Sequence, residues 1–310
     1  MSSTPHANAP DHSRDNLITG TLCKLAATFL FALMFASIRW LGPNFPIGEV
    51  VFFRSLLGLP VIMLTAIASG GLRLLATKRI DNHAVRALAG TVAMFCNFAA
   101  YTHLPLADAT AIGFAAPLFV VILAVVMLGE RVHAYRWSAV ILGFAGVMVI
   151  VGPEAGITPG ALLGAGYALS GALLAALAMI FVRRMSAHEH STTIAFYFML
   201  TSCCISLFTA PFGWEMPTRG QALTLVFLGL AGGTGQLFLS YSYRFSEASA
   251  LAPFDYTAMI WAVVIGYVWF AELPSLQVWL GAAIVIGAGL LIFWRERKLG
   301  RDRALSSSPL

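Results

Sequence analysis

Long apolar stretches alternate with short polar connections along the chain from residue 18 to residue 294. The longest stretches, of about 17 to 24 residues, can cross a hydrocarbon core of roughly 30 Å as helices. Because a backbone in lipid must satisfy its own hydrogen bonds, such stretches indicate helices and not the alternating strands of a membrane barrel. The pattern predicts an all-α polytopic membrane protein with ten transmembrane helices, at residues 18–41, 46–68, 84–102, 106–128, 137–151, 160–184, 192–210, 221–243, 248–270 and 276–294.

The two ends of the chain depart from this pattern. Residues 1–17 are polar, contain Pro5 and Pro10 and have no apolar core, so we expect a disordered cytoplasmic tail and not a cleaved signal. Residues 295–310 are expected to form a basic cytoplasmic tail.

Composition and charge agree with a membrane location. The chain is 59% hydrophobic and 11% charged, whereas an ordinary soluble domain is roughly 25% charged. Lys and Arg gather in the even-numbered connections and the C-terminal tail, so the positive-inside rule predicts a multi-pass protein of the cytoplasmic (inner) membrane with both termini in the cytoplasm. The net charge of +5 is therefore a topology signal and requires no nucleic-acid partner. Whether the protein is a monomer or a homodimer stays open.

The two halves of the chain resemble each other. When "VVILAVVMLGERVHAYRW" is aligned with "VVIGYVWFAELPSLQVW", Glu130 meets Glu272 and Trp137 meets Trp279. Five spans per half is an odd number, so the second half enters the membrane from the opposite side, as an inverted repeat. Such repeats generate two related conformations around a central site, which favours a transporter that works by alternating access.

A family resemblance rests on "YTHLPLADATAIGFAAPLFVVILAVVMLGERVHAYRWSAVILGFAGVMVIVG", from Tyr101, and on "EVVFFRSLLGLP", with Arg54. These segments resemble the EamA-type domain of the drug/metabolite transporter superfamily. The resemblance implies two such repeats, at residues 18–151 and 160–294. The second half departs from the pattern, since Met259 stands where the repeat places Pro117 and Ala271 stands in place of the glycine before the repeated glutamate.

What the resemblance implies is export or exchange of small metabolites, without a cofactor and without an ATP-hydrolysing domain. No G-x-x-x-x-G-K-[ST] loop occurs in the chain. The narrower hypothesis is a YddG-like exporter of aromatic or other neutral amino acids. Alternatives are export of other metabolites or cationic drugs in the same fold, or a membrane-embedded enzyme or assembly partner. No nucleophile and base pair and no metal-ligand spacing is evident, so no catalytic or metal site is expected.

Polar side chains on two corresponding helices are candidates for a substrate site. Met94, Asn97 and Tyr101 share one face of the third predicted helix because they lie three and four residues apart. The eighth predicted helix repeats that spacing with Gln236, Ser240 and Tyr243. These groups can bind a polar or zwitterionic ligand, or they can only join helices to one another.

Ionisable residues within the spans are further candidates. Arg54 lies near the middle of the second span, where an arginine is costly, so it either binds a carboxylate, acts in gating or is bonded to another helix. Glu49, five residues before it, is a poor direct partner but a candidate for coupling. Lys24 either snorkels to the headgroups or acts at a gate. Glu272 and Glu130 are expected to hold the repeat together at the membrane interfaces.

The stretch "APFDYTAMIW", residues 252 to 261, holds the acid for which a function is most expected. Pro253 can interrupt a helix, and broken helices at membrane depth line cavities. Asp255 is therefore a candidate for the substrate path and for proton coupling, with Tyr256 and Trp261 beside it. The alternative is that Asp255 complements the dipole in the first turn of a helix that begins later.

Overall fold

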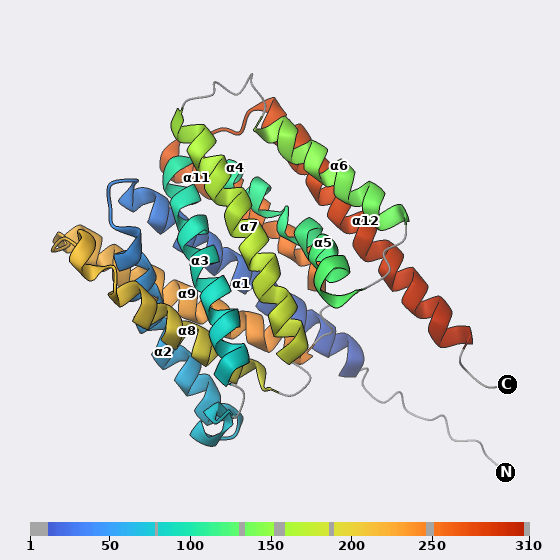
Figure 1. Cartoon of the computed structure of the whole chain (residues 1–310), viewed down its shortest axis with the longest axis horizontal. Coiled ribbons are helices and arrows are strands. Elements are labelled where there is room, and N and C mark those ends of the chain that lie inside the picture. The colour runs from blue at the N-terminus through green and yellow to red at the C-terminus, as the bar shows by residue number, and fades with distance from the viewer. Residues whose placement is uncertain are drawn as a thin grey trace, which may run out of the picture.

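The computed structural model describes residues 12–77, 80–129, 134–151, 159–185, 189–245 and 251–306. These residues form an all-helical bundle (Figure 1). Its helices in the first half are α1 (His12–Leu41), α2 (Ile47–Ser69), α3 (Ile80–His103), α4 (Leu106–Gly113), α5 (Ala116–Leu128) and α6 (Ala134–Ile150). The second half holds α7 (Pro159–Met185), α8 (Ser191–Leu207), α9 (Arg219–Phe245), α11 (Thr257–Phe270) and α12 (Leu276–Ser306), and short 3₁₀ turns η1 (Leu72–Leu75), η3 (Ala210–Phe212) and η4 (Ala252–Tyr256) lie between helices.

The helices reproduce the predicted spans. Within the described ranges, seven helical segments are long and apolar enough to cross a membrane, and three shorter apolar helices lie at Trp137–Ile150, Thr192–Leu207 and Leu276–Leu291. Each of the ten overlaps one predicted span. Large apolar side chains such as Leu64, Val126 and Ile141 are exposed on the surface of the bundle, as lipid contact requires. The chain is thus a multi-pass membrane protein.

Two helices extend beyond the spans predicted for them. α1 begins at His12, so residues 12–17, which the sequence placed in the tail, are helical. α12 continues to Ser306, well beyond the predicted end of the last span at residue 294. Hydropathy marks where apolar residues stop, but a helix can continue into water because each further residue adds a backbone hydrogen bond. Residues 1–11 and 307–310 lie outside the described residues.

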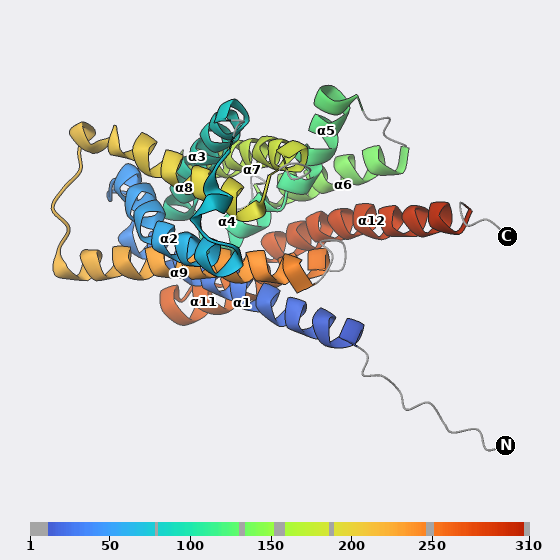
Figure 2. The same cartoon turned by 90° about the horizontal axis from the view of Figure 1, so that it is seen from below.

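The contacts between helices follow the repeat. α3 packs on α7 as α1 packs on α9, and the two second helices of the repeats, α2 and α8, pack on each other. α6 and α12 lie side by side at one edge and run in opposite directions (Figures 1 and 2). This arrangement is that of two inverted five-helix repeats.

The ends of α5 and α11 show the same repeat at the level of the backbone. Gly129 and Ala271 each follow the helix in the left-handed conformation, with φ of 66° and 53°. The backbone N–H of each residue donates to the carbonyls four and five residues earlier. These hydrogen bonds are typical of a helix C-cap. The register that pairs Glu130 with Glu272 therefore agrees with the structure, although Glu130 itself lies outside the described residues.

Candidate functional site

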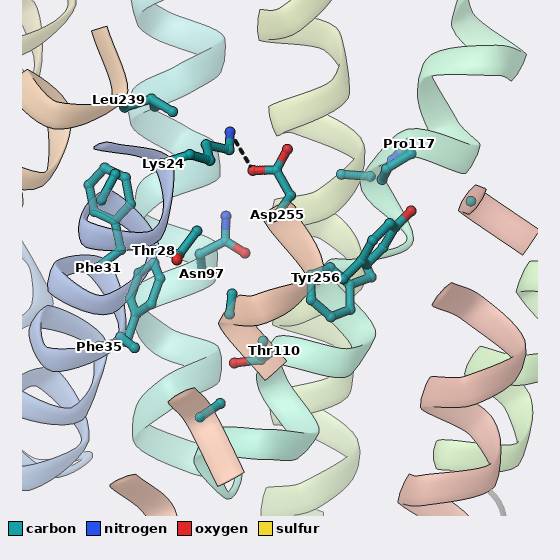
Figure 3. A pocket seen from close by; sticks show the side chains of 18 of the residues that line it. Lys24, Thr28, Phe31, Phe35, Asn97, Thr110, Pro117, Leu239, Asp255 and Tyr256 are labelled. Atoms are coloured by element: carbon teal, nitrogen blue, oxygen red, sulfur yellow. Dashed lines mark ion pairs between the residues drawn. The ribbon is translucent and has the colours of Figure 1, made fainter. Parts of the chain in front are cut away.

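A cavity of about 650 Å³ lies inside the bundle, within the range typical of small-molecule sites. α1, α3, α4, α5, η4 and α11 supply most of its wall, with single contributions from α7 and α9 and two residues of α12. Figure 3 shows side chains from these elements pointing into one space. Those labelled are Lys24, Thr28, Phe31, Phe35, Asn97, Thr110, Pro117, Leu239, Asp255 and Tyr256.

One ion pair crosses this cavity. Lys24 Nζ lies 2.6 Å from Asp255 Oδ1, which joins α1 to η4 (Figure 3). The Lys24 side chain is only 1% exposed, whereas that of Asp255 is 50% exposed and faces the cavity. The snorkelling interpretation of Lys24 is therefore wrong. Its ammonium turns into the bundle, where the oppositely charged carboxylate of Asp255 lies.

The cavity lies where two corresponding helices are interrupted. The fourth predicted span is divided into α4 and α5 at Phe114 and Ala115, and Pro117 stands in the first turn of α5. The ninth contains the 3₁₀ turn η4, with Pro253, before α11 starts at Thr257. Backbone that leaves helical geometry at membrane depth is tolerated where it lines a cavity. Sequence reasoning found the second interruption but drew the first span as continuous.

Asp255 has features of both interpretations drawn from the sequence, namely a residue in the first turn of a helix and an acid at the cavity. It lies in the first turn of a short helix, as the dipole interpretation requires, but no side chain caps the N-terminus of η4 or of α11. Its carboxylate pairs with Lys24 and lines the cavity. The tertiary fold thus directs this acid toward the cavity.

Asn97 and Tyr101 of α3 line the cavity together. The Tyr101 hydroxyl lies 3.3 Å from Thr110 Oγ1 of α4, and its ring stacks on Phe35 of α1 at a centroid distance of 4.3 Å. Met94, predicted on the same face, is buried in the core and does not line the cavity. Three residues before Asn97, it lies one helical turn farther from the cavity wall.

Gln236 and Ser240, two of the three residues predicted on one face of the eighth span, do not line the cavity. Ser240 donates its hydroxyl hydrogen to the Gln236 carbonyl of its own helix, at 2.9 Å, and Leu239 is the residue of α9 that lines the cavity. The side chain of Tyr243 lies outside the described residues. Neighbouring residues on a helix point in directions about 100° apart. The orientation of α9 in the bundle therefore turns Leu239 toward the cavity and the adjacent Ser240 away from it.

The aromatic residues near Asp255 have different roles. Tyr256 lines the cavity, and its ring packs edge-on against Phe114. A Cβ on Gly289 of α12 would lie 2.0 Å from the Tyr256 hydroxyl, so this glycine leaves room for the phenol. Trp261 lies outside the cavity wall. Its indole N–H donates to Thr28 Oγ1 at 3.3 Å, which positions a hydroxyl that does line the cavity.

Sequence reasoning predicted Lys24 but missed the other residues of one face of α1. Lys24, Thr28, Phe31 and Phe35 recur every three or four residues and all line the cavity. The spacing was available in the sequence, but apolar residues are so frequent in a transmembrane helix that the two phenylalanines carry little signal by themselves.

Arg54 and Glu49 do not line the cavity. Both are buried on α2, at 5% and 2% exposure, away from the Lys24 and Asp255 pair. α2 contributes no residue to the cavity wall and instead packs against α8 and α9. Their depth in the membrane was apparent from the sequence, but the neighbours of α2 were not.

Glu272 joins three elements near the end of the cavity that is predicted to face outward. It accepts a hydrogen bond from Arg39 Nε of α1 at 2.6 Å and one from the backbone N–H of Leu106, at the start of α4, at 3.1 Å. Leu106 itself lines the cavity. The interpretation of Glu272 as an acid that binds an arginine and backbone at the interface is confirmed. Within the described ranges, no group of three His, Cys, Asp or Glu side chains could hold a metal ion.

Comparison with known proteins agrees with this architecture. The EamA-like transporter family matches residues 18–152 and 162–294, and the chain belongs to that family. The pseudopaline exporter of Pseudomonas aeruginosa is 29% identical over 282 residues, covering 90% of this chain and 94% of its own. The S-adenosylmethionine uptake transporter of Rickettsia prowazekii is 29% identical, covering 87% of this chain and 92% of its own.

Two further comparisons extend the range of relatives. The riboflavin transporter of Vibrio cholerae is 27% identical, covering 93% of this chain and 98% of its own. A solved crystal structure with 20% sequence identity has a TM-score of 0.63 and covers 91% of this chain and 99% of its own, which shows the shared fold. The family and these relatives define the class as a transporter of small metabolites.

Proposed function

We propose that this protein is a secondary transporter that exports or exchanges amino acids, or related compounds with one positive and one negative group, across the cytoplasmic membrane. The observation that carries the proposal is the Lys24–Asp255 pair, which places both signs of charge 2.6 Å apart at the cavity. S-adenosylmethionine, the compound named for one group of relatives, itself contains an α-amino acid group.

The pair suggests how such a compound is bound. The substrate carboxylate takes Lys24 as its partner, and the substrate ammonium takes Asp255. In the empty cavity the two side chains neutralise each other, so a zwitterion replaces one ion pair with two and leaves no charge unpaired. A compound with a single charge would leave one member of the pair without a partner in a partly dehydrated site, which is costly.

The remaining wall favours a substrate with an apolar or aromatic portion. Phe31, Phe35 and Tyr256 offer ring faces and edges, and Asn97 offers an amide donor and acceptor between them (Figure 3). Aromatic pairs contribute about 0.5–1.5 kcal/mol beyond the area that they bury. This combination supports aromatic and other neutral amino acids as the first compounds to test.

Alternating access supplies the transport step in this proposal. Two inverted repeats can exchange their conformations around the cavity, and the interruptions in α4–α5 and η4–α11 provide points where helices can bend. Asp255 is the residue that we expect to couple transport to protons, because its carboxylate both binds substrate and faces the cavity.

Substrate counterflow in proteoliposomes that contain only the purified protein tests this function. We expect uptake of labelled aromatic or neutral amino acids in exchange for unlabelled substrate inside. Lys24→Gln and Asp255→Asn should each lower counterflow by about tenfold or more, the effect of one charge-assisted hydrogen bond. Arg73→Gln, an exposed change outside the membrane core, is the matched control and should transport normally.

The same assay identifies the alternatives. Counterflow of nucleosides, riboflavin or cationic drugs but of no amino acid would retain the transporter class and reject the zwitterion proposal. Normal counterflow and an unchanged pH dependence in Asp255→Asn would remove Asp255 from the substrate and proton path.

A further inference from the structure

Two arginine side chains approach the same aromatic ring inside the bundle, away from the cavity. Arg54 comes from α2 and Arg86 from α3, and both approach the ring of Phe198 on α8. Their Cζ atoms lie 5.9 Å and 4.1 Å from the centroid of that ring. Neither residue lines the cavity that contains Lys24 and Asp255.

The guanidinium groups are not satisfied by the protein around them. The Nε and Nη1 atoms of both arginines are buried and have no hydrogen-bond partner, and the Arg54 residue is only 5% exposed. In the part of the chain that the structure describes, the ion pairs are Lys24–Asp255, Arg39–Glu272 and His83–Glu189, so neither arginine is paired with a carboxylate.

The acid on the same helix does not fill this role. Glu49 lies five residues before Arg54, which places it about 140° around the helix, and its Oε2 also lacks a hydrogen-bond partner. His83, one turn before Arg86 on α3, has Glu189 as its neighbour at 3.7 Å. Among the residues that the structure describes, two positive groups therefore lie against one aromatic ring without a carboxylate partner.

This situation is energetically unfavourable unless a further group binds there. An arginine remains charged in proteins, and a buried donor without a partner loses the hydrogen bond that it made with water. The contact with the Phe198 ring recovers only a part of this energy, since cation–π contacts contribute about 0.5–2 kcal/mol. The two guanidinium groups also repel each other.

We propose that Arg54 and Arg86 together bind one small oxyanion, a carboxylate or a phosphate group, between α2, α3 and α8. The planar guanidinium fork matches the paired oxygens of these groups and donates two parallel hydrogen bonds. Two sources carry this chemistry in a membrane, namely a dissolved anion and the phosphate of an anionic lipid headgroup.

Two glycines leave room for the side chains of this site, and a hydrogen bond joins two of its helices. A Cβ on Gly90 of α3 would lie 2.9 Å from the Phe198 ring and 3.5 Å from Arg86 Nη1. A Cβ on Gly232 of α9 would lie 3.4 Å from Arg54 Nε. Next to Gly90, the hydroxyls of Thr91 and Ser202 lie 2.7 Å apart and join α3 to α8.

Thermal unfolding of the purified full chain tests the proposal, because a ligand of the folded state raises its melting temperature. The chain is placed in nanodiscs of neutral phosphatidylcholine and titrated with inorganic phosphate, and in parallel in nanodiscs that contain phosphatidylglycerol. We expect wild type to be stabilised in at least one arm. Arg54→Gln and Arg86→Gln should weaken binding by about tenfold or more, the effect of losing one charge-assisted hydrogen bond.

A matched variant separates binding from folding. Arg73→Gln removes an exposed arginine and should respond like wild type. If a glutamine variant does not fold, Arg54→Lys and Gly90→Ala are compared in its place, since both keep the two positive charges. Arg54→Lys removes the planar guanidinium group, and Gly90→Ala adds a methyl group beside Arg86 and Phe198.

Each outcome decides the proposal. Stabilisation by phosphate in neutral nanodiscs assigns a dissolved oxyanion, and stabilisation by phosphatidylglycerol alone assigns a lipid headgroup. An absence of stabilisation in both arms overturns the site. So does an equal response of wild type and of every folded variant at Arg54, Arg86 and Gly90.

Discussion

Ala271 has a backbone conformation that residues with a Cβ rarely adopt. Its φ is 53°, in the left-handed region, and it ends α11 as Gly129 ends α5. Glycine adopts this conformation without steric cost, whereas a non-glycine residue is strained there. The chain uses glycine at this position in the first repeat and alanine in the second.

We therefore predict that Ala271→Gly stabilises the protein, by about 0.5–1 kcal/mol, because the strain removed exceeds the entropy that glycine loses on folding. Ala283→Gly on the exposed side of α12 is the control, and it should cost about 1 kcal/mol because that position is regular helix. Thermal unfolding of the purified variants measures both. Destabilisation of equal size at the two positions would contradict this account of the helix end.

The Lys24–Asp255 pair gives a second prediction at the level of single residues. Because Asp255 is half exposed, water screens the pair, and we expect a coupling free energy of about 1 kcal/mol and not the several kcal/mol of a fully buried pair. A double-mutant cycle with Lys24→Met and Asp255→Asn measures it through thermal unfolding without substrate. Strictly additive effects would indicate that the two side chains do not stabilise each other.

At the level of helices, small residues decide which surfaces meet. Gly146 of α6 and Gly281 of α12 face each other so closely that a Cβ on Gly281 would lie 2.6 Å from the Gly146 carbonyl oxygen. Gly229 and Gly233 of α9 similarly lie against α2, at Leu57 and Gly58. Such close backbone contact joins membrane helices because lipid offers no hydrophobic driving force for their association. These four glycines therefore permit close packing between helices.

Gly281→Ala should accordingly separate α6 from α12 and cost about 1–3 kcal/mol, the usual cost of overpacking. Gly287→Ala on the same helix has open space around its Cβ, so it should be neutral or slightly stabilising. Thermal unfolding compares the two. A loss at Gly287 as large as that at Gly281 would mean that helix propensity, and not the α6–α12 contact, determines the result.

Helices were more predictable than the side chains that they direct inward. Apolar length alone located all ten spans, because the bilayer thickness fixes the length that a helix needs. Asn97, Tyr101, Asp255, Tyr256 and Lys24 were predicted as site residues and do line the cavity. Gln236 and Ser240 do not, because the rotation of α9 about its axis depends on its contacts with α1 and α2.

In the molecule as a whole, the Arg39–Glu272 contact joins the two repeats at the predicted outer side. α1 belongs to the first repeat, and Glu272 follows α11 of the second. A transporter that alternates between two conformations must rearrange contacts between its repeats, so we expect this contact to break when the cavity opens outward.

Cross-linking tests this expectation. In a chain whose four native cysteines are replaced, Arg39→Cys and Glu272→Cys are joined by a bis-methanethiosulfonate reagent, which forms one disulfide with each thiol. We expect counterflow to stop and to return when the link is reduced. Arg39→Cys alone, treated in the same way, is the control and should continue to transport. Unchanged counterflow in the cross-linked protein would show that α1 and α11 stay together throughout the cycle.

The sequence by itself determined the membrane class, the ten helices and the inverted repeat, because these depend on hydropathy and on internal similarity along one chain. It also indicated that Asp255, near Pro253, is a candidate functional residue. Only the tertiary structure decided that Lys24 is the partner of Asp255, that α1 supplies one wall of the cavity, and that Arg54 and Arg86 approach the same ring elsewhere. Those contacts join residues far apart in the chain, and they depend on how each helix is rotated against its neighbours.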